Sequence, residues 1–144
     1  MKLTSALALS SVAIVTILSL ARAAEIPDAL SVEWQGKHPC EKLFEDTQIR
    51  VARCTFPPGA VHVCHSHPSY FGYAISGGRA QVQDEKGIRS ADIVSGTSRD
   101  IPAIAWHQFT NTGDTTIEYI LVEKKYEPPP AADQSSCPKR DAVD

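Results

Sequence analysis

The stretch Gly59-Ala60-Val61-His62-Val63-Cys64-His65-Ser66-His67 holds three of the five histidines of the chain and follows a Pro57-Pro58-Gly59 turn. Side chains alternate between the two faces of an extended strand, so His65 and His67 project to the same side and can bind one ion together. Neutral imidazole is the commonest protein ligand of metals. The sequence therefore predicts a metal site on this strand. His62, three residues before His65, is expected on the opposite face as a surface residue.

Short segments with strand character lie on both sides of this stretch. They span residues 49–56, 71–75, 79–83, 88–94, 106–110 and 116–124. Gly, Pro, Asn or Asp residues separate these segments, and the tight loop at 84–87 is typical of a hairpin. After residue 24 no sustained helical period is present. The pattern predicts an all-β protein, either an antiparallel sandwich or a barrel.

Residues 1–24 have the features of a secretory signal peptide. Lys2 precedes an apolar run at residues 6–20, and Ala21-Arg22-Ala23 offers a cleavage site of small residues. A membrane anchor is the alternative, but serines and threonines interrupt the run, which is shorter than the roughly 20 residues a span needs. We therefore expect an exported protein, periplasmic or secreted, with no membrane segment after cleavage.

The remaining chain suits one small domain. We expect an irregular N-terminal arm at 25–45, the domain at 46–125 and a Pro-rich C-terminal tail at 126–144. Cleavage at residue 24 removes two of the 14 basic residues and none of the 17 acidic ones, which gives a net charge of −5. This acidic balance argues against nucleic acid as a partner.

All four cysteines lie after residue 24 and would meet an oxidising compartment. We favour a Cys40–Cys137 disulfide, because it would join the arm to the tail and close a long loop. Cys54 and Cys64 are nearly equidistant from the Pro57-Pro58-Gly59 turn, but strand alternation places them on different faces. Their pairing would need a bulge or a change of sheet. At least one disulfide is expected.

A second informative segment lies about forty residues further on. Gly59, five residues and His65-x-His67 resemble the first motif of the cupins. Gly96, five residues, Pro102, and then His107 with an asparagine four residues later resemble the second motif. The motifs and their strands cover residues 46–125. In addition, His65-Ser66-His67-Pro68-Ser69-Tyr70 is similar to the small single-domain cupins associated with β-alanine degradation.

The cupin resemblance implies a double-stranded β-helix, also called a jelly-roll barrel. It also implies one divalent metal, Fe(II), Mn(II), Ni(II) or Zn(II), bound by His65, His67 and His107. Phe71 stands where the family has a glutamate, and Ile104 stands where it has a glycine. Three neutral imidazoles leave the charge of a divalent ion uncompensated, so we expect a small anionic ligand.

Two functions follow from this resemblance. Three-histidine iron sites resemble those of the thiol dioxygenases, which implies a metal-dependent oxygenase acting on a small anionic or thiol metabolite. The alternative is a cupin that binds a metal or small molecule without turnover. Because cupins commonly pair through outer strands, the resemblance also implies a homodimer.

The inner face of the strands is expected to form the ligand pocket. The alternation of His65 and His67, continued along the chain, places Phe71, Tyr73 and Ile75 inside, and Phe109 shares a face with His107. Tyr73 is then the candidate catalytic residue that assists the metal. Phe71, Ile75 and Phe109 would line an apolar pocket or simply form the barrel core. No acidic residue is expected on the inner face of the histidine strand.

Overall fold

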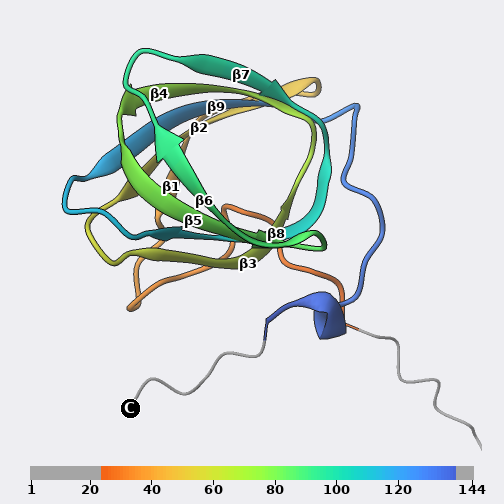
Figure 1. Cartoon of the computed structure of the whole chain (residues 1–144). Helices are drawn as coiled ribbons and strands as arrows, with labels where there is room; N and C mark the ends of the chain where they lie inside the picture. Colours follow the sequence, from red (N-terminus) through yellow and green to blue (C-terminus); the bar gives the residue numbers. More distant parts are fainter. Residues whose placement is uncertain (1–23, 139–144) are drawn as a thin grey trace, which may run out of the picture.

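Two antiparallel β-sheets face each other in the computed structural model, which describes residues 24–138 (Figure 1). The elements are β1 (Cys40–Glu45), β2 (Ile49–Phe56), β3 (Val61–His67), β4 (Tyr70–Ser76), β5 (Gly78–Asp84), β6 (Gly87–Ile93), β7 (Ser98–Ile101), β8 (Ile104–Asn111), β9 (Ile117–Lys124) and the 3₁₀ helix η1 (Gln134–Ser136). One sheet has the order β1-β2-β9-β4-β7 and the other the order β3-β8-β5-β6. The predicted all-β jelly roll is confirmed.

The two ends of the chain lie partly outside this description. Apart from Ala24, the predicted signal peptide belongs to the part that the structure does not describe. Across residues 24–138 no helix has the length and apolar character of a membrane span. The last six residues of the predicted arm form β1, which pairs with β2 at the edge of the first sheet.

The core lies between the sheets and follows the alternation of the strands. Cys54 and Phe56 of β2, together with Ile117 and Leu121 of β9, are buried on the inner face of the first sheet. Phe109 of β8 meets Phe56 from the other sheet, with ring centroids 4.8 Å apart. Burial of large apolar side chains stabilises the barrel by roughly 1.5–3 kcal/mol for each one.

A bulge in β3 changes the face of His62. His62 pairs with Phe109 and His65 with His107, so three residues of β3 match two of β8. The extra residue lets both His62 and His65 face the interior. The prediction of a surface histidine is therefore wrong: His62 is 3% exposed, and its Nε2–H donates to the carbonyl of Ala29.

The chain changes sheets at Pro68 and Ser69, which reverses the predicted facing of β4. His67 ends a strand of the second sheet, whereas Tyr70 begins a strand of the first. The inward residues of β4 are Tyr70, Gly72 and Ala74. The outward residues are the predicted pocket residues Phe71, Tyr73 and Ile75, which are 42%, 41% and 41% exposed. Alternation cannot be continued across a crossover from one sheet to another.

The structure contains two disulfides, and neither is the favoured Cys40–Cys137 pair. Cys40 bonds Cys54, its direct partner in the β1–β2 ladder, and Cys64 bonds Cys137 of the tail. The favoured Cys40–Cys137 pairing is wrong because the end of the arm is a paired strand. Cys54 and Cys64 do not pair with each other, as strand alternation predicts, since Cys54 faces the core and Cys64 faces the tail.

Candidate metal centre

Three imidazoles converge at one end of the barrel interior. His65 and His67 come from β3 and His107 from β8, and all three are buried. The Nε2 atom of His65 lies 2.9 Å from that of His67 and 2.8 Å from that of His107. One ligand atom from each residue lies within 4.8 Å of the others. The structure thus brings together the three predicted ligands.

Hydrogen bonds fix the orientation of two of the rings. Nδ1–H of His65 donates to the carbonyl of Val63 at 2.6 Å, and Nδ1–H of His67 donates to the carboxylate of Glu123 at 2.7 Å. The Nε2 atoms of His65 and His67 therefore carry lone pairs that face each other. A cation among these nitrogens would turn that repulsion into attraction.

The spacing of the nitrogens suits a first-row metal ion. Such ions bind imidazole nitrogen at about 2.0–2.1 Å, so two nitrogens at a right angle around one ion lie about 2.9 Å apart. The two nitrogen–nitrogen distances around His65 agree with this value. Three protein ligands leave positions open for a small molecule. The residues present therefore fit the metal that the resemblance implies.

Burial keeps His65 and His107 neutral. It lowers the pKa of His65 and of His107 well below the usual value, and the neighbouring imidazoles lower both further. Burial also lowers the pKa of His62 to about 3. The ring of His62 stacks on that of His65, with centroids 3.7 Å apart. Since metals bind the neutral form of imidazole, His65 and His107 are ready to bind a metal at neutral pH.

A buried carboxylate supports the site, and the sequence analysis missed it. Glu123 of β9 is 0% exposed and binds both His67 and Arg50. Arg50 also donates to Asp28 of the arm at 2.7 Å. The row Ile117, Tyr119, Leu121 and Glu123 follows strand alternation, so an inward glutamate could have been inferred from the sequence. This chain of contacts links the arm to a metal-ligand candidate.

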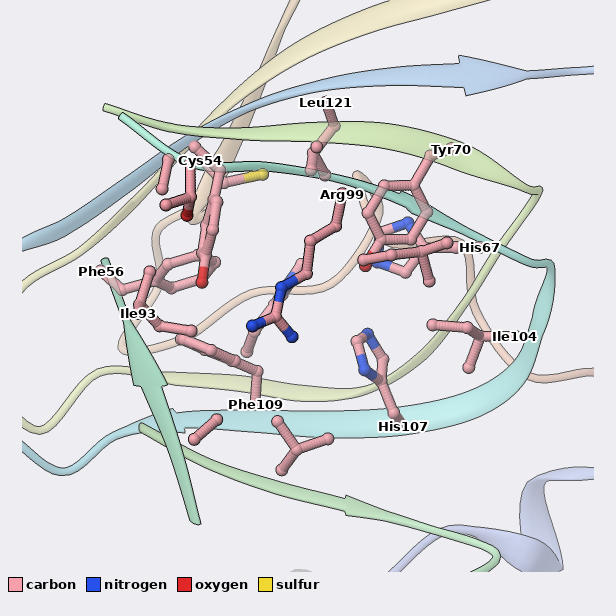
Figure 2. Close-up of a pocket in the computed structure, with 18 of the residues that line it drawn as sticks. Cys54, Phe56, His67, Tyr70, Ile93, Arg99, Ile104, His107, Phe109 and Leu121 are labelled. Atoms are coloured by element: carbon pink, nitrogen blue, oxygen red, sulfur yellow. The ribbon is translucent and has the colours of Figure 1, made fainter. Parts of the chain in front are cut away.

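A cavity of about 240 Å³ opens beside the histidines, between the two sheets (Figure 2). Apolar side chains from both sheets form most of its wall, including Val82, Ile93, Ile101, Ile104, Phe109 and Leu121. Gly72 and Ala74 line it from β4. A Cβ atom at position 72 would lie 3.4 Å from the ring of Tyr70 and 3.6 Å from the side chain of Leu121, in the space that glycine leaves empty. Small residues on β4 thus leave room for a ligand.

Of the predicted pocket residues, Phe109 lines this cavity. Phe71, Tyr73 and Ile75 lie on the outer face of the barrel, so the proposed assistance by Tyr73 is wrong. Two other phenols, Tyr70 and Tyr119, line the cavity in its place. Burial raises the pKa of both hydroxyls, so each stays protonated and can donate a hydrogen bond.

No protein-family model and no curated protein matches the sequence. Solved structures do match. A cupin domain from Bordetella pertussis Tohama I aligns with 74% of this chain and 98% of its own, at 20% identity and a TM-score of 0.55. The protein has a cupin fold. A cupin-like protein from Thermotoga maritima covers 69% of this chain and 77% of its own, at 21% identity and a TM-score of 0.53.

A third structure, of a conserved protein with a double-stranded β-helix domain from Klebsiella pneumoniae, aligns with 73% of this chain and 92% of its own. Its identity is 16% and its TM-score 0.51. Identities of this size establish the shared fold alone. Function is therefore inferred from the side chains of this chain and their geometry.

Proposed function

We propose that this protein is an exported cupin that binds one divalent metal through His65, His67 and His107. The convergence of three Nε2 atoms beside a cavity carries the proposal. Fe(II), Mn(II), Ni(II) and Zn(II) all suit an imidazole site. When bound, the metal would act as a Lewis acid or as an oxygen-binding centre for a small molecule, which makes a metal-dependent oxygenase the first enzyme activity to test.

The charge of the site supports an anionic ligand. Glu123 is matched by Arg50, so its carboxylate adds no net negative charge next to the metal ligands. Metals bind imidazole in its neutral form, so a divalent ion would bring two positive charges that its ligands do not offset. Tyr119 offers a protonated hydroxyl on the cavity wall. A small acid or thiolate would meet both charge and hydrogen-bond donors there. Acids of the size of β-alanine are among the first compounds to test, given the motif similarity.

Binding without turnover is the second candidate. Of the carboxylates in the described part of the chain, Glu123 is already engaged by His67 and Arg50. Asp92 also belongs to the cavity wall, but it is exposed and lies between the inward residues Ala91 and Ile93 of β6. Strand alternation therefore directs its side chain toward solvent. Within residues 24–138, Glu123 is the one buried carboxylate, so no buried carboxylate is free to act as a general base at the cavity. Product analysis separates the two candidates.

Export and dimer formation complete the proposal. Two disulfides suit an oxidising compartment, which agrees with the predicted signal peptide. One row of apolar side chains crosses the outer face of the first sheet. Its members are neighbours in the strand ladders: Phe44, Val51, Val122 and Phe71. Phe44 and Phe71 are 52% and 42% exposed. An exposed apolar row supports pairing with a second copy.

Metal loading tests the proposal. Protein purified without chelator is incubated with each of the four metals, and bound metal is counted after desalting. We expect one ion per chain and a higher melting temperature in wild type. His107→Ala should retain less metal after desalting and show a smaller rise in melting temperature. Oxygen consumption and product formation are then followed with small thiols, amino acids and dicarboxylates. Absence of stoichiometric metal together with an unchanged melting temperature would refute the metal centre, and activity that survives in His107→Ala would refute its catalytic role.

A further inference from the structure

A single arginine points into the cavity without a partner. Arg99 lies on the edge strand β7 directly opposite Gly72, and both belong to the cavity wall. Figure 2 shows its side chain extending toward the sheet that carries His107 and Phe109. Within residues 24–138 its guanidinium makes neither a hydrogen bond nor an ion pair. Its neighbour Asp100 lies on the other face, where it binds Lys124 at 2.8 Å.

Among residues 24–138, Arg99 is the one cation of the cavity wall whose charge has no partner. Arg89 also lines the wall, but its guanidinium binds Asp84 at 2.6 Å and is 53% exposed. The charge of Arg99 reaches Tyr119, where it works against the rise in pKa that burial causes. Guanidinium groups bind carboxylates through two parallel hydrogen bonds. Arg99 is exposed to solvent, so a ligand can reach it from outside.

The ladder places Arg99 at some distance from the histidines. Tyr70 and Ile101 form one inward row, and Tyr70 packs against His67 with ring centroids 4.8 Å apart. Arg99 and Gly72 form the next inward row, two residues further along the strands. Two residues of a strand span about 6–7 Å. The cavity therefore has two polar ends separated by an apolar stretch.

We propose that Arg99 binds the carboxylate of a short bifunctional acid whose second donor group reaches the metal at His65, His67 and His107. The short carbon chain of this ligand lies against the apolar wall between the two ends. This inference rests on the proposed metal centre and adds the class of ligand and the residue that selects it. Arg99 contacts the ligand directly and takes no part in holding the metal.

Calorimetric titration with matched acids tests the assignment. The probes are succinate and glutarate, each compared with the monoacid of the same chain length, butanoate or pentanoate, on the Ni(II)-loaded protein. We expect wild type to bind at least one diacid roughly 10- to 100-fold more tightly than its monoacid, the range expected for a charged hydrogen-bonded pair. In Arg99→Gln this ratio should fall to about threefold or less. Arg99→Lys should retain part of it, because the charge stays and the forked geometry is lost.

The matched control is Arg89→Gln, which removes a cation of the same wall that already has a partner. It should keep the wild-type preference for the diacid. An equal preference for the diacid in wild type and Arg99→Gln would overturn the assignment. Wild-type protein that binds none of the four acids, or that binds diacid and monoacid equally well, would also overturn it.

Metal analysis of the same samples separates this inference from the proposed function. One Ni(II) per chain in wild type and in Arg99→Gln, with unchanged acid preference, would defeat the inference alone. If wild type held no metal, the proposed function would fail, and butanoate would be titrated into the metal-free protein. Weaker binding to Arg99→Gln would then still support the carboxylate site, whereas equal affinity would overturn it.

Discussion

Replacing Glu123 by glutamine should weaken both the metal site and the fold. Glu123 is fully buried and accepts from Nδ1–H of His67 at 2.7 Å, and its other oxygen binds Arg50. Glutamine keeps the shape but removes the charge that holds both groups. Loss of such a partner behind a metal-bound histidine typically lowers metal affinity about 10- to 100-fold. We expect a decrease in that range for Glu123→Gln.

The same substitution should lower the free energy of unfolding. Removing one partner of a buried ion pair costs about 3–5 kcal/mol. Arg50 would keep its contact with Asp28, so we expect a loss of about 3 kcal/mol, at the low end of that range. Urea denaturation of the metal-free protein measures this loss, and competition with a chelator of known affinity measures the metal.

Glu118→Gln is the matched control on the same strand. Glu118 forms an ion pair with Arg53 at 3.1 Å, away from the histidines and partly in solvent. Pairs of this kind contribute about 0–1 kcal/mol, so the control should change stability little and metal affinity not at all. The reasoning fails if Glu123→Gln binds metal within threefold of wild type and unfolds at the same urea concentration.

Four further predictions address other parts of the account. His65→Ala should abolish metal binding in dialysis, because its Nε2 joins the other two ligands. Tyr73→Phe should leave acid binding by calorimetry unchanged, since its side chain lies outside the barrel, whereas Tyr119→Phe should weaken it. For the metal-free protein, the folded pKa of His62, about 3, lies below the unfolded value of 6.5, so stability is complete above pH 6.5 and falls as the pH drops toward 3. Urea denaturation should give a free energy of unfolding that is about 2–3 kcal/mol lower at pH 4.5 than at pH 7.5 because of this residue. His62→Gln should lack this contribution. Peptide mapping of the oxidised protein should recover Cys40–Cys54 and Cys64–Cys137, and a Cys40–Cys137 peptide would contradict the fold of the arm.

The predicted ligands were identified by motif spacing, which local geometry preserves. His65 and His67 share a face because β3 alternates regularly between them, and the register shift at this point adds its extra residue on β8. His107 is the ladder partner of His65. His62 was misplaced because a bulge adds one residue before His65. A bulge depends on the partner strand and leaves no mark in a single strand's pattern.

Facing on β4 and the pairing of the cysteines depend on contacts between distant segments. The change of sheet at Pro68 reverses the alternation for Phe71 and the residues after it. Cys40 meets Cys54 because β1 pairs with β2, although the arm sequence has little periodicity. The inward position of Glu123 could have been predicted from the sequence, since Glu123 continues the alternating row of inward residues on β9. Arg99 could not be placed in the same way, because its four-residue edge strand is not among the strands that the sequence predicts.

X-ray absorption spectroscopy of the metal-loaded protein tests the central claim most directly. It counts the imidazole ligands of the ion and measures their distances. Three imidazole nitrogens at about 2.0–2.1 Å are expected in wild type and two in His107→Ala. Oxygen or nitrogen donors other than histidine should fill the remaining positions. A spectrum with no imidazole scattering, or one that is the same in wild type and His107→Ala, would contradict a metal centre built from His65, His67 and His107.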